Sequence, residues 1–178
     1  MPAAVFTFKE KTMKRSLLIL LLTAACCTSK AQVNYYKGEW SKAGKSDLFS
    51  GIFKIEIKKD GSMTGELAWL YLATDSTDEQ MVQVYKGKKG KQAIEVVEGR
   101  YTAETNDLYW AGEERIDPFD IISLDKYNLK LSPDKQVIYG TTFTGGTNSG
   151  MFYATRINNG SGAAMFNAAK AKVKKKAD

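Results

Sequence analysis

The residues that most often carry enzyme chemistry are scarce in this sequence. It contains no histidine, and its two cysteines, Cys26 and Cys27, lie in an N-terminal segment that we expect to be removed. These absences exclude a Ser-His-Asp triad, a histidine general base and, in the processed chain, a thiolate nucleophile or a Cys/His zinc site. Acid–base chemistry would fall to carboxylates, lysine or tyrosine. We predict no metal site and no cofactor.

Carboxylates are concentrated between residues 95 and 125. The candidates among them are Glu95, Glu98, Glu113, Glu114, Asp117, Asp120 and Asp125. Two of them acting as general acid and general base would make a secreted hydrolase of the glycosidase type. The alternative is structural, because Glu98 shares a strand face with Arg100, and Glu113 shares one with Arg115. A hairpin could lay these residues opposite one another as mixed-charge pairs, and this is the favoured interpretation.

Aromatic residues recur in the predicted strands at positions able to face inward. The candidates for lining the interior of a barrel are Trp69, Tyr101, Trp110, Tyr139 and Phe143. They would bind a small apolar or carbohydrate ligand, since a barrel of about eight strands is either packed solid or holds one small molecule. The alternative is that they fill an ordinary core. The alternation shows which residues share a face, but it does not show which face is hollow.

Period-two alternation of apolar and polar residues is the dominant pattern between residues 34 and 157, and turn residues interrupt it at regular intervals. Asp60-Gly61 is the strongest hairpin signal, because glycine accepts a positive φ. The expected strands are 35–40, 49–57, 63–71, 81–85, 92–103, 108–116, 121–124, 127–131, 136–143 and 151–157. The segments 121–124 and 127–131 are either two strands or one bent strand. Sequential hairpins favour an all-β, closed antiparallel up-and-down barrel of about eight strands over a two-sheet sandwich.

The domain organisation follows from the two ends of the chain. Residues 32–157 form the predicted barrel domain. Residues 158–162 are expected to be a flexible link, and residues 163–176 a short C-terminal helix that frays at its lysine-rich end.

The N-terminal 31 residues have the pattern of a signal peptide. Lys14 and Arg15 precede an apolar run over residues 16–25, and cleavage is expected before Gln32. The apolar run is shorter than the ~20 residues of a membrane-spanning helix, so no transmembrane segment is expected after cleavage. The protein is therefore predicted to be secreted or periplasmic. The alternative is a lipid anchor on Cys26 or Cys27.

The net charge of +6 does not indicate a nucleic-acid partner. The positive surplus lies in the predicted leader and in the tail. Residues 32–169 contain 16 Lys and Arg against 18 Asp and Glu, so the folded body is slightly acidic. We therefore expect no nucleic-acid binding.

Gly38 and Trp40 on the first strand, with Arg156 on the last, resemble the pattern of the calycin superfamily, which includes the lipocalins. The resemblance implies that Arg156 packs over the Trp40 ring at the closed end of the barrel. It also implies that Gly38, Trp40 and Arg156 are structural rather than ligand-binding residues. A helix after the last strands agrees with it, whereas the segment 124–127 matches the family's Thr-Asp-Tyr element only in part.

These observations together predict an exported, lipocalin-like barrel of unknown specificity. It would bind a small ligand inside the barrel or a partner through its rim loops. The alternative is the carboxylate-based hydrolase.

Overall fold

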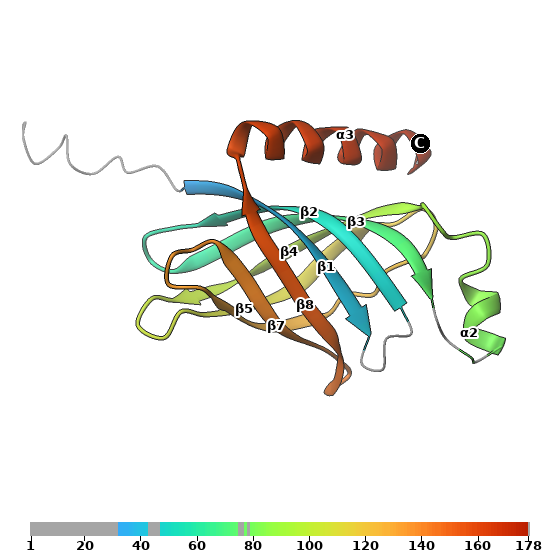
Figure 1. Cartoon of the computed structure of the whole chain (residues 1–178), viewed down its shortest axis with the longest axis horizontal. Coiled ribbons are helices and arrows are strands. Elements are labelled where there is room, and N and C mark those ends of the chain that lie inside the picture. The colour runs from blue at the N-terminus through green and yellow to red at the C-terminus, as the bar shows by residue number, and fades with distance from the viewer. Residues whose placement is uncertain (1–31, 43–46, 75–76, 78, 178) are drawn as a thin grey trace, which may run out of the picture. The chain divides into compact units, whose positions relative to one another are not determined.

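The computed structural model describes residues 32–42, 47–74, 77 and 79–177. The strands within these ranges are β1 (Gln32–Lys42), β2 (Asp47–Ile57), β3 (Ser62–Thr74), β4 (Gln92–Thr102), β5 (Asp107–Ile116), β6 (Lys126–Leu131), β7 (Val137–Thr144) and β8 (Thr147–Ile157). The helices are α2 (Glu79–Val84) and α3 (Asn159–Ala177) (Figure 1). The predicted signal peptide, with Cys26 and Cys27, lies outside the described residues, so export and lipid attachment stay predictions.

The eight strands form one closed antiparallel barrel. Each strand pairs with its neighbours in sequence, and β1 pairs with β8 from Tyr35 opposite Ile157 to Lys42 opposite Gly150. Closure leaves no free sheet edge. The predicted up-and-down barrel is confirmed, and the two-sheet sandwich is excluded.

Gly38 allows β1 and β8 to approach each other closely. It is buried opposite Ala154, and a Cβ atom at residue 38 would overlap the Tyr153 carbonyl and the Ala154 side chain. Any larger residue here would push the closing strands apart.

The interior of the barrel is packed with side chains that alternate with exposed ones along each strand. In β1, Tyr36 is buried while Lys37 and Glu39 are exposed. Phe152 of β8 lies at the centre of the packing and is 1% exposed. Its ring contacts those of Phe53, Trp69, Trp110 and Tyr127, with centroids between 5.1 and 6.1 Å away.

Helix α3 covers part of the outside of the barrel (Figure 1). Phe166 and Val173 are buried against Ile52, Ala68 and Ile94, which point outward from β2, β3 and β4. These outward apolar residues are therefore a second, smaller core. No helix within the described ranges has the length and apolar character needed to span a bilayer.

The structure corrects the predicted start of the C-terminal helix. The helix begins at Asn159, so most of the expected flexible link is helical. The Asn158 side chain caps it by accepting a hydrogen bond from the Gly160 N–H at 2.9 Å. Gly162 is buried against the Tyr35 ring, where a Cβ atom would overlap that ring.

Two predicted strand segments are wrong. The segment 81–85 falls in helix α2 and the residues after it, because β3 and β4 pair directly and leave no partner for a strand between them. Its alternating Val82 and Val84 are exposed. The segment 121–124 is an irregular part of the connection between β5 and β6.

The expected contact between Arg156 and Trp40 is not formed. Arg156 lies opposite Tyr36, whereas Trp40 lies opposite Phe152, four residues away along β1. Four residues of strand span about 13 Å, which is too far for a cation–π contact. Among the described residues, the cations that lie over rings are Lys88, Lys91 and Lys170.

Phe152→Ala is expected to lower the free energy of unfolding by about 3–5 kcal/mol, because it removes the ring on which four other aromatic rings pack. Tyr153→Ala is the matched control. Tyr153 is the next residue but is 54% exposed on the outer face, so its removal should change stability by less than about 0.5 kcal/mol. Urea unfolding of both variants measures the difference. Equal losses would contradict the assignment of the two faces.

Candidate functional site

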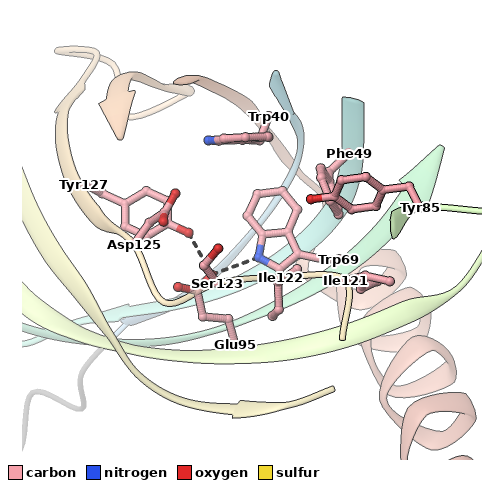
Figure 2. Close-up of a pocket in the computed structure, with 10 residues that line it drawn as sticks. All are labelled: Trp40, Phe49, Trp69, Tyr85, Glu95, Ile121, Ile122, Ser123, Asp125 and Tyr127. Carbon is pink, nitrogen blue, oxygen red and sulfur yellow. Dashed lines mark hydrogen bonds between the residues drawn. The ribbon is translucent and has the colours of Figure 1, made fainter. Parts of the chain in front are cut away.

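One end of the barrel holds a small cup. It is lined by Trp40, Phe49, Trp69, Tyr85, Glu95, Ile121, Ile122, Ser123, Asp125 and Tyr127 (Figure 2). The cup has a volume of about 60 Å³. Five strands contribute to it, together with the residue after α2 and the connection between β5 and β6. These parts are far apart in sequence and come together because the barrel closes.

A carboxyl group, that of Glu95, is buried in the wall of the cup and is 1% exposed. Its Oε2 accepts hydrogen bonds from the Trp69 indole N–H at 3.0 Å and from the Tyr127 hydroxyl at 2.7 Å. Its Oε1 has no hydrogen-bond partner among the described residues. Gly112 leaves room for the carboxyl, since a Cβ atom there would overlap Oε1.

Burial raises the pKa of Glu95 from its ordinary value of 4.5 to about 7. Loss of solvation disfavours the charged form, and the nearby Asp125 carboxylate adds to this effect, while hydrogen bonding by Tyr127, Trp69 and the Asp125 backbone opposes it. Burial and the same carboxylates also raise the pKa of Tyr127, so its hydroxyl stays protonated and acts as a donor. Glu95 is thus a carboxyl that changes charge near neutral pH.

Asp125 is the second carboxylate in the wall of the cup and is 9% exposed. It accepts a short hydrogen bond from the Thr144 hydroxyl. Its backbone carbonyl accepts a hydrogen bond from the Gly112 N–H at 2.8 Å, which ties the segment before β6 to β5. Glu95 lies within β4 and Asp125 lies directly before β6. Both are next to Gly112 of β5, Glu95 through its carboxyl oxygen and Asp125 through its backbone carbonyl.

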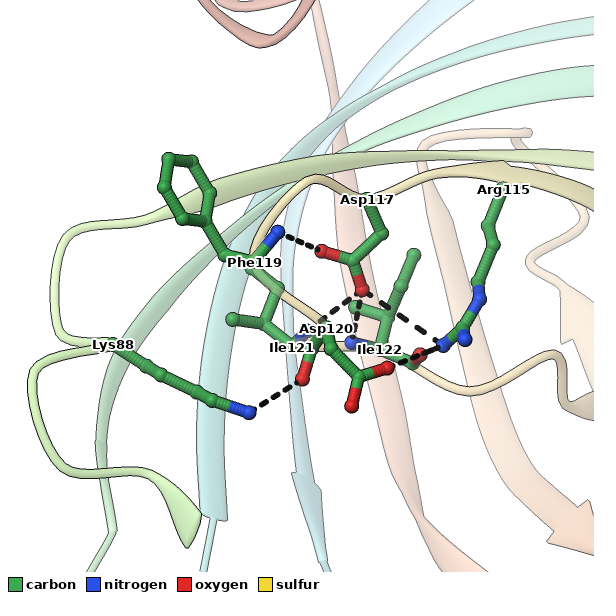
Figure 3. A network of polar contacts seen from close by, with 7 residues as sticks. All are labelled: Lys88, Arg115, Asp117, Phe119, Asp120, Ile121 and Ile122. Atoms are coloured by element: carbon green, nitrogen blue, oxygen red, sulfur yellow. Dashed lines mark hydrogen bonds and ion pairs between the residues drawn. The ribbon is translucent and has the colours of Figure 1, made fainter. Parts of the chain in front are cut away.

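The connection between β5 and β6, residues 117–125, forms one side of the cup, and we call it the rim segment. Asp117, whose side chain is 1% exposed, holds it together. Its carboxylate accepts hydrogen bonds from the backbone N–H groups of Phe119, Ile121 and Ile122 at 3.3, 2.7 and 2.8 Å (Figure 3). The single buried carboxylate thus fixes the backbone that carries the rim residues of the cup.

Two basic residues brace the rim segment from outside. Arg115 pairs with Asp117 at 3.9 Å and with Asp120 at 3.2 Å. Lys88, from the connection between α2 and β4, donates to the Asp120 carbonyl at 2.7 Å (Figure 3). The rim segment is therefore anchored both to β5 and to the neighbouring connection.

Aromatic rings make up the rest of the wall. The Trp40 indole N–H donates to the Thr142 hydroxyl at 2.8 Å, and its ring packs edge-on against Phe49 at 5.6 Å. Phe49 in turn contacts Trp69 at 6.3 Å. Tyr85 stacks on Tyr71 at 5.0 Å. These contacts fix the rings in place before any ligand arrives.

The structure divides the five aromatic residues expected to line the interior. Trp69 lies in the wall of the cup. Trp110 is fully buried and Tyr101 is partly buried, and both pack within the core rather than around the cup. Tyr139 is 46% exposed on the outside of β7, so its expected inward orientation is wrong. Phe143 is half-buried and belongs to neither apolar cluster, because strand alternation puts it on the same face of β7 as the exposed Tyr139.

Sequence reasoning missed several parts of the cup. Trp40 was expected to be structural, yet it lines the cup. Tyr85, Ile121 and Ile122 were placed in strands that do not form. Of the carboxylates, Glu95 and Asp125 were among the candidates, but no pattern in the sequence singled them out from the other five.

The predicted cross-strand pairs of Glu98 and Glu113 with arginine are also wrong. Glu98 lies opposite Ala111, and Arg100 lies opposite Tyr109. Glu113 lies opposite no residue of β4, because the register shift beside Val96 makes it the extra residue between Gly112 and Glu114. Within the described ranges, no three acidic or other metal-ligating side chains gather as a metal site would require.

The stability of the protein should fall as the pH rises through the range in which Glu95 titrates. Because its pKa is raised on folding, the folded state holds this proton between pH 4.5 and about 7, where the unfolded chain has lost it. The contribution is complete below 4.5 and is lost as the pH passes 7. Between pH 5 and pH 8 the loss should be about 2–3 kcal/mol. Urea unfolding at several pH values measures it.

Glu95→Gln supplies the control for this pH dependence. The amide keeps the shape of the protonated acid but cannot ionise, so this variant should lose the Glu95 part of the slope. Identical pH profiles for the wild type and Glu95→Gln would show that Glu95 does not titrate in this range.

Asp117→Ala should loosen the rim segment. It removes the acceptor of three backbone N–H groups, which we expect to lower stability by about 1–3 kcal/mol. Amide hydrogen exchange at Ile121 and Ile122 should accelerate more than exchange in β2 and β3. Glu104→Ala is the control, because Glu104 is exposed in the turn between β4 and β5, at the opposite end of β5 from the rim segment. Unchanged exchange in Asp117→Ala would contradict the anchoring role.

Comparison with known proteins adds no relative: no protein family, no curated protein and no solved structure matches this chain. The cup itself is therefore the basis for assigning a function.

Proposed function

We propose that this protein is a binding barrel whose cup takes a small organic ligand, or the head group of a larger one. The observation that carries the proposal is a preformed hollow, walled by fixed aromatic rings, with the partly unsatisfied Glu95 carboxyl in its wall. Apolar walls with a few convergent polar groups are the usual composition of small-molecule sites.

The size of the cup limits the ligand. Sites for drug-sized molecules enclose about 300 Å³ or more. The cup, at about 60 Å³, has room for a few water molecules or a few heavy atoms. A lipid chain or a whole sugar ring inside the barrel is therefore disfavoured, and the rest of a larger ligand would lie outside the rim.

The proposal includes export of the protein and a resemblance to the calycin class of barrels. An exported, calycin-like binding protein agrees with the closed eight-stranded barrel and the helix on its outside. The position of Arg156, away from Trp40, is a departure from the calycin pattern.

One observation favours a second candidate, the carboxylate-based hydrolase. Glu95 has a pKa near 7 and shares the cup with Asp125, so one could act as acid and the other as base. The small cup disfavours this function, because a glycosidic bond must be flanked by a sugar on at least one side. Turnover of chromogenic glycosides that is lost in both Glu95→Gln and Asp125→Asn would establish the hydrolase instead of the binding barrel.

The three tryptophans allow the binding proposal to be tested by fluorescence. Trp40 and Trp69 line the cup, whereas Trp110 is in the packed core. Small alcohols, amines, carboxylic acids, amides and monosaccharides form the panel, with fatty acids and retinoids as large ligands. A binding compound should change the emission of Trp110→Phe, which keeps both cup tryptophans. It should leave the double variant Trp40→Phe/Trp69→Phe unchanged.

Ser123→Phe fills the cup from the rim segment and should abolish the response. Thr155→Phe, on the exposed outside of β8, is the matched control and should keep it. No response to any compound, or a response that persists in Ser123→Phe, would overturn the proposal.

A further inference from the structure

The side chains that line the cup are acidic, aromatic, aliphatic or small, and the described ones include no basic residue. Its wall contains two carboxyl groups, those of Glu95 and Asp125, and five aromatic side chains. None of the described residues that line it is lysine or arginine. An anion would meet carboxylates and the negative faces of aromatic rings, so the cup disfavours anionic ligands.

We propose that the ligand group taken up by the cup is a small organic cation, such as the ammonium group of an amine, held by the Glu95 and Asp125 carboxylates and by the aromatic wall. This inference rests on the proposed binding function and names its ligand class. Aromatic rings attract cations through their quadrupole, and the attraction is strongest where water is excluded.

The unsatisfied oxygen of Glu95 is the second observation behind this proposal. Oε2 already accepts two hydrogen bonds, while Oε1 is buried without a partner. A buried acceptor left unpaired costs stability, and an ammonium group with three donors would supply the missing bond.

The groups that face the Glu95 carboxyl from the neighbouring strands determine how easily it ionises. Tyr127 on β6 donates to it, Trp69 on β3 donates to it, and Asp125 before β6 repels its ionised form. On β5, Arg115 lies opposite Glu95 in the ladder but is exposed and pairs with Asp117 and Asp120. Among the described residues no basic side chain pairs with the Glu95 carboxyl, and a cationic ligand would supply that partner.

Two lysines among the described residues, Lys88 and Lys91, contact the rim segment. Lys88 donates to the Asp120 carbonyl, and its Nζ lies 5.4 Å from the centre of the Tyr85 ring. Lys91 Nζ lies 4.7 Å from the centre of the Phe119 ring. Both ammonium groups already rest on aromatic rings of this region, which is the same interaction that we propose for the ligand.

The sign of the pH dependence separates a cation from a neutral ligand. A cation binds best when Glu95 is ionised, so its affinity should rise about tenfold from pH 6 to pH 8, as linkage to a pKa near 7 requires. A neutral hydrogen-bond acceptor needs the protonated acid as donor, and its affinity should fall over the same range. An alkylammonium ion keeps its charge throughout, since its pKa is close to that of lysine, about 10.4.

The test uses n-butylammonium, n-butanol and butyrate, which share a chain and differ in the charge of the head group. The indole N–H signals of the three tryptophans in a ¹H–¹⁵N NMR spectrum are the readout, assigned with single Trp→Phe variants. The Trp69 signal reports directly on Glu95, because the Trp69 indole N–H donates a hydrogen bond to the Glu95 carboxyl. We expect butylammonium to shift the Trp40 and Trp69 signals, with affinity at least tenfold above that of butanol, and butyrate to shift neither.

Glu95→Gln should weaken butylammonium binding at pH 8 about tenfold and remove its dependence on pH. Glu98→Gln, an exposed acid on the same strand, is the matched control and should change neither. If Glu95→Gln does not fold, the wild-type pH series decides alone. Equal or tighter binding of butanol, or affinity for butylammonium that does not rise with pH, would overturn the inference. Shifts of Trp40 and Trp69 by butanol would still leave the binding function in place.

Discussion

The ladder between β1 and β8 is the contact on which the rest of this structure depends. It joins the first strand of the barrel to the last, and it converts a linear series of hairpins into a ring without free edges. The close approach needs Gly38, because a side chain there would collide with β8. Only when the ring is closed do Trp40, Glu95 and Tyr127, which belong to three different hairpins, face the same small space.

The middle of the barrel interior and the end that holds the cup are packed differently. Towards the middle, rings packed around Phe152 fill the available volume, and removing any of them would leave a cavity. At the end that holds the cup, a polar cluster of Glu95, Trp69 and Tyr127 replaces the purely apolar packing. Burying Glu95 costs solvation, which the Trp69 and Tyr127 hydrogen bonds offset only in part, as the pKa near 7 shows. An apolar residue at this position would avoid that cost, and this is why the proposed function is built on the Glu95 carboxyl.

The rim segment shows how an irregular connection is made rigid enough to shape a site. It has no regular ladder of its own, so its backbone N–H groups need other acceptors. The buried Asp117 carboxylate accepts three of them. With Arg115 and Lys88 outside, this arrangement holds Ile121, Ile122 and Asp125 over the cup without a strand or a helix. Helix α3, in contrast, covers apolar residues on the outside of β2 to β4 and does not line the cup.

From the sequence alone follow the all-β class and a closed antiparallel barrel of about eight strands, although the strand predicted at 81–85 does not form. Period-two alternation and turn residues such as Asp60-Gly61 are local signals, and sequential hairpins close most simply as a barrel. The sequence did not determine where the hollow lies or which residues surround it. Tyr139 and Trp110 have similar strand patterns, yet one is exposed and the other is buried. Glu98 and Arg100 lie opposite Ala111 and Tyr109 rather than opposite charged residues, and Phe143 lies outside the core on the same strand face as the exposed Tyr139. The sequence also does not distinguish Glu95 from the other carboxylates. Its raised pKa comes from burial beside Trp69, Tyr127 and Asp125. Those contacts join strands that are distant in the chain, and only the closed tertiary structure brings them within a few ångströms of one another.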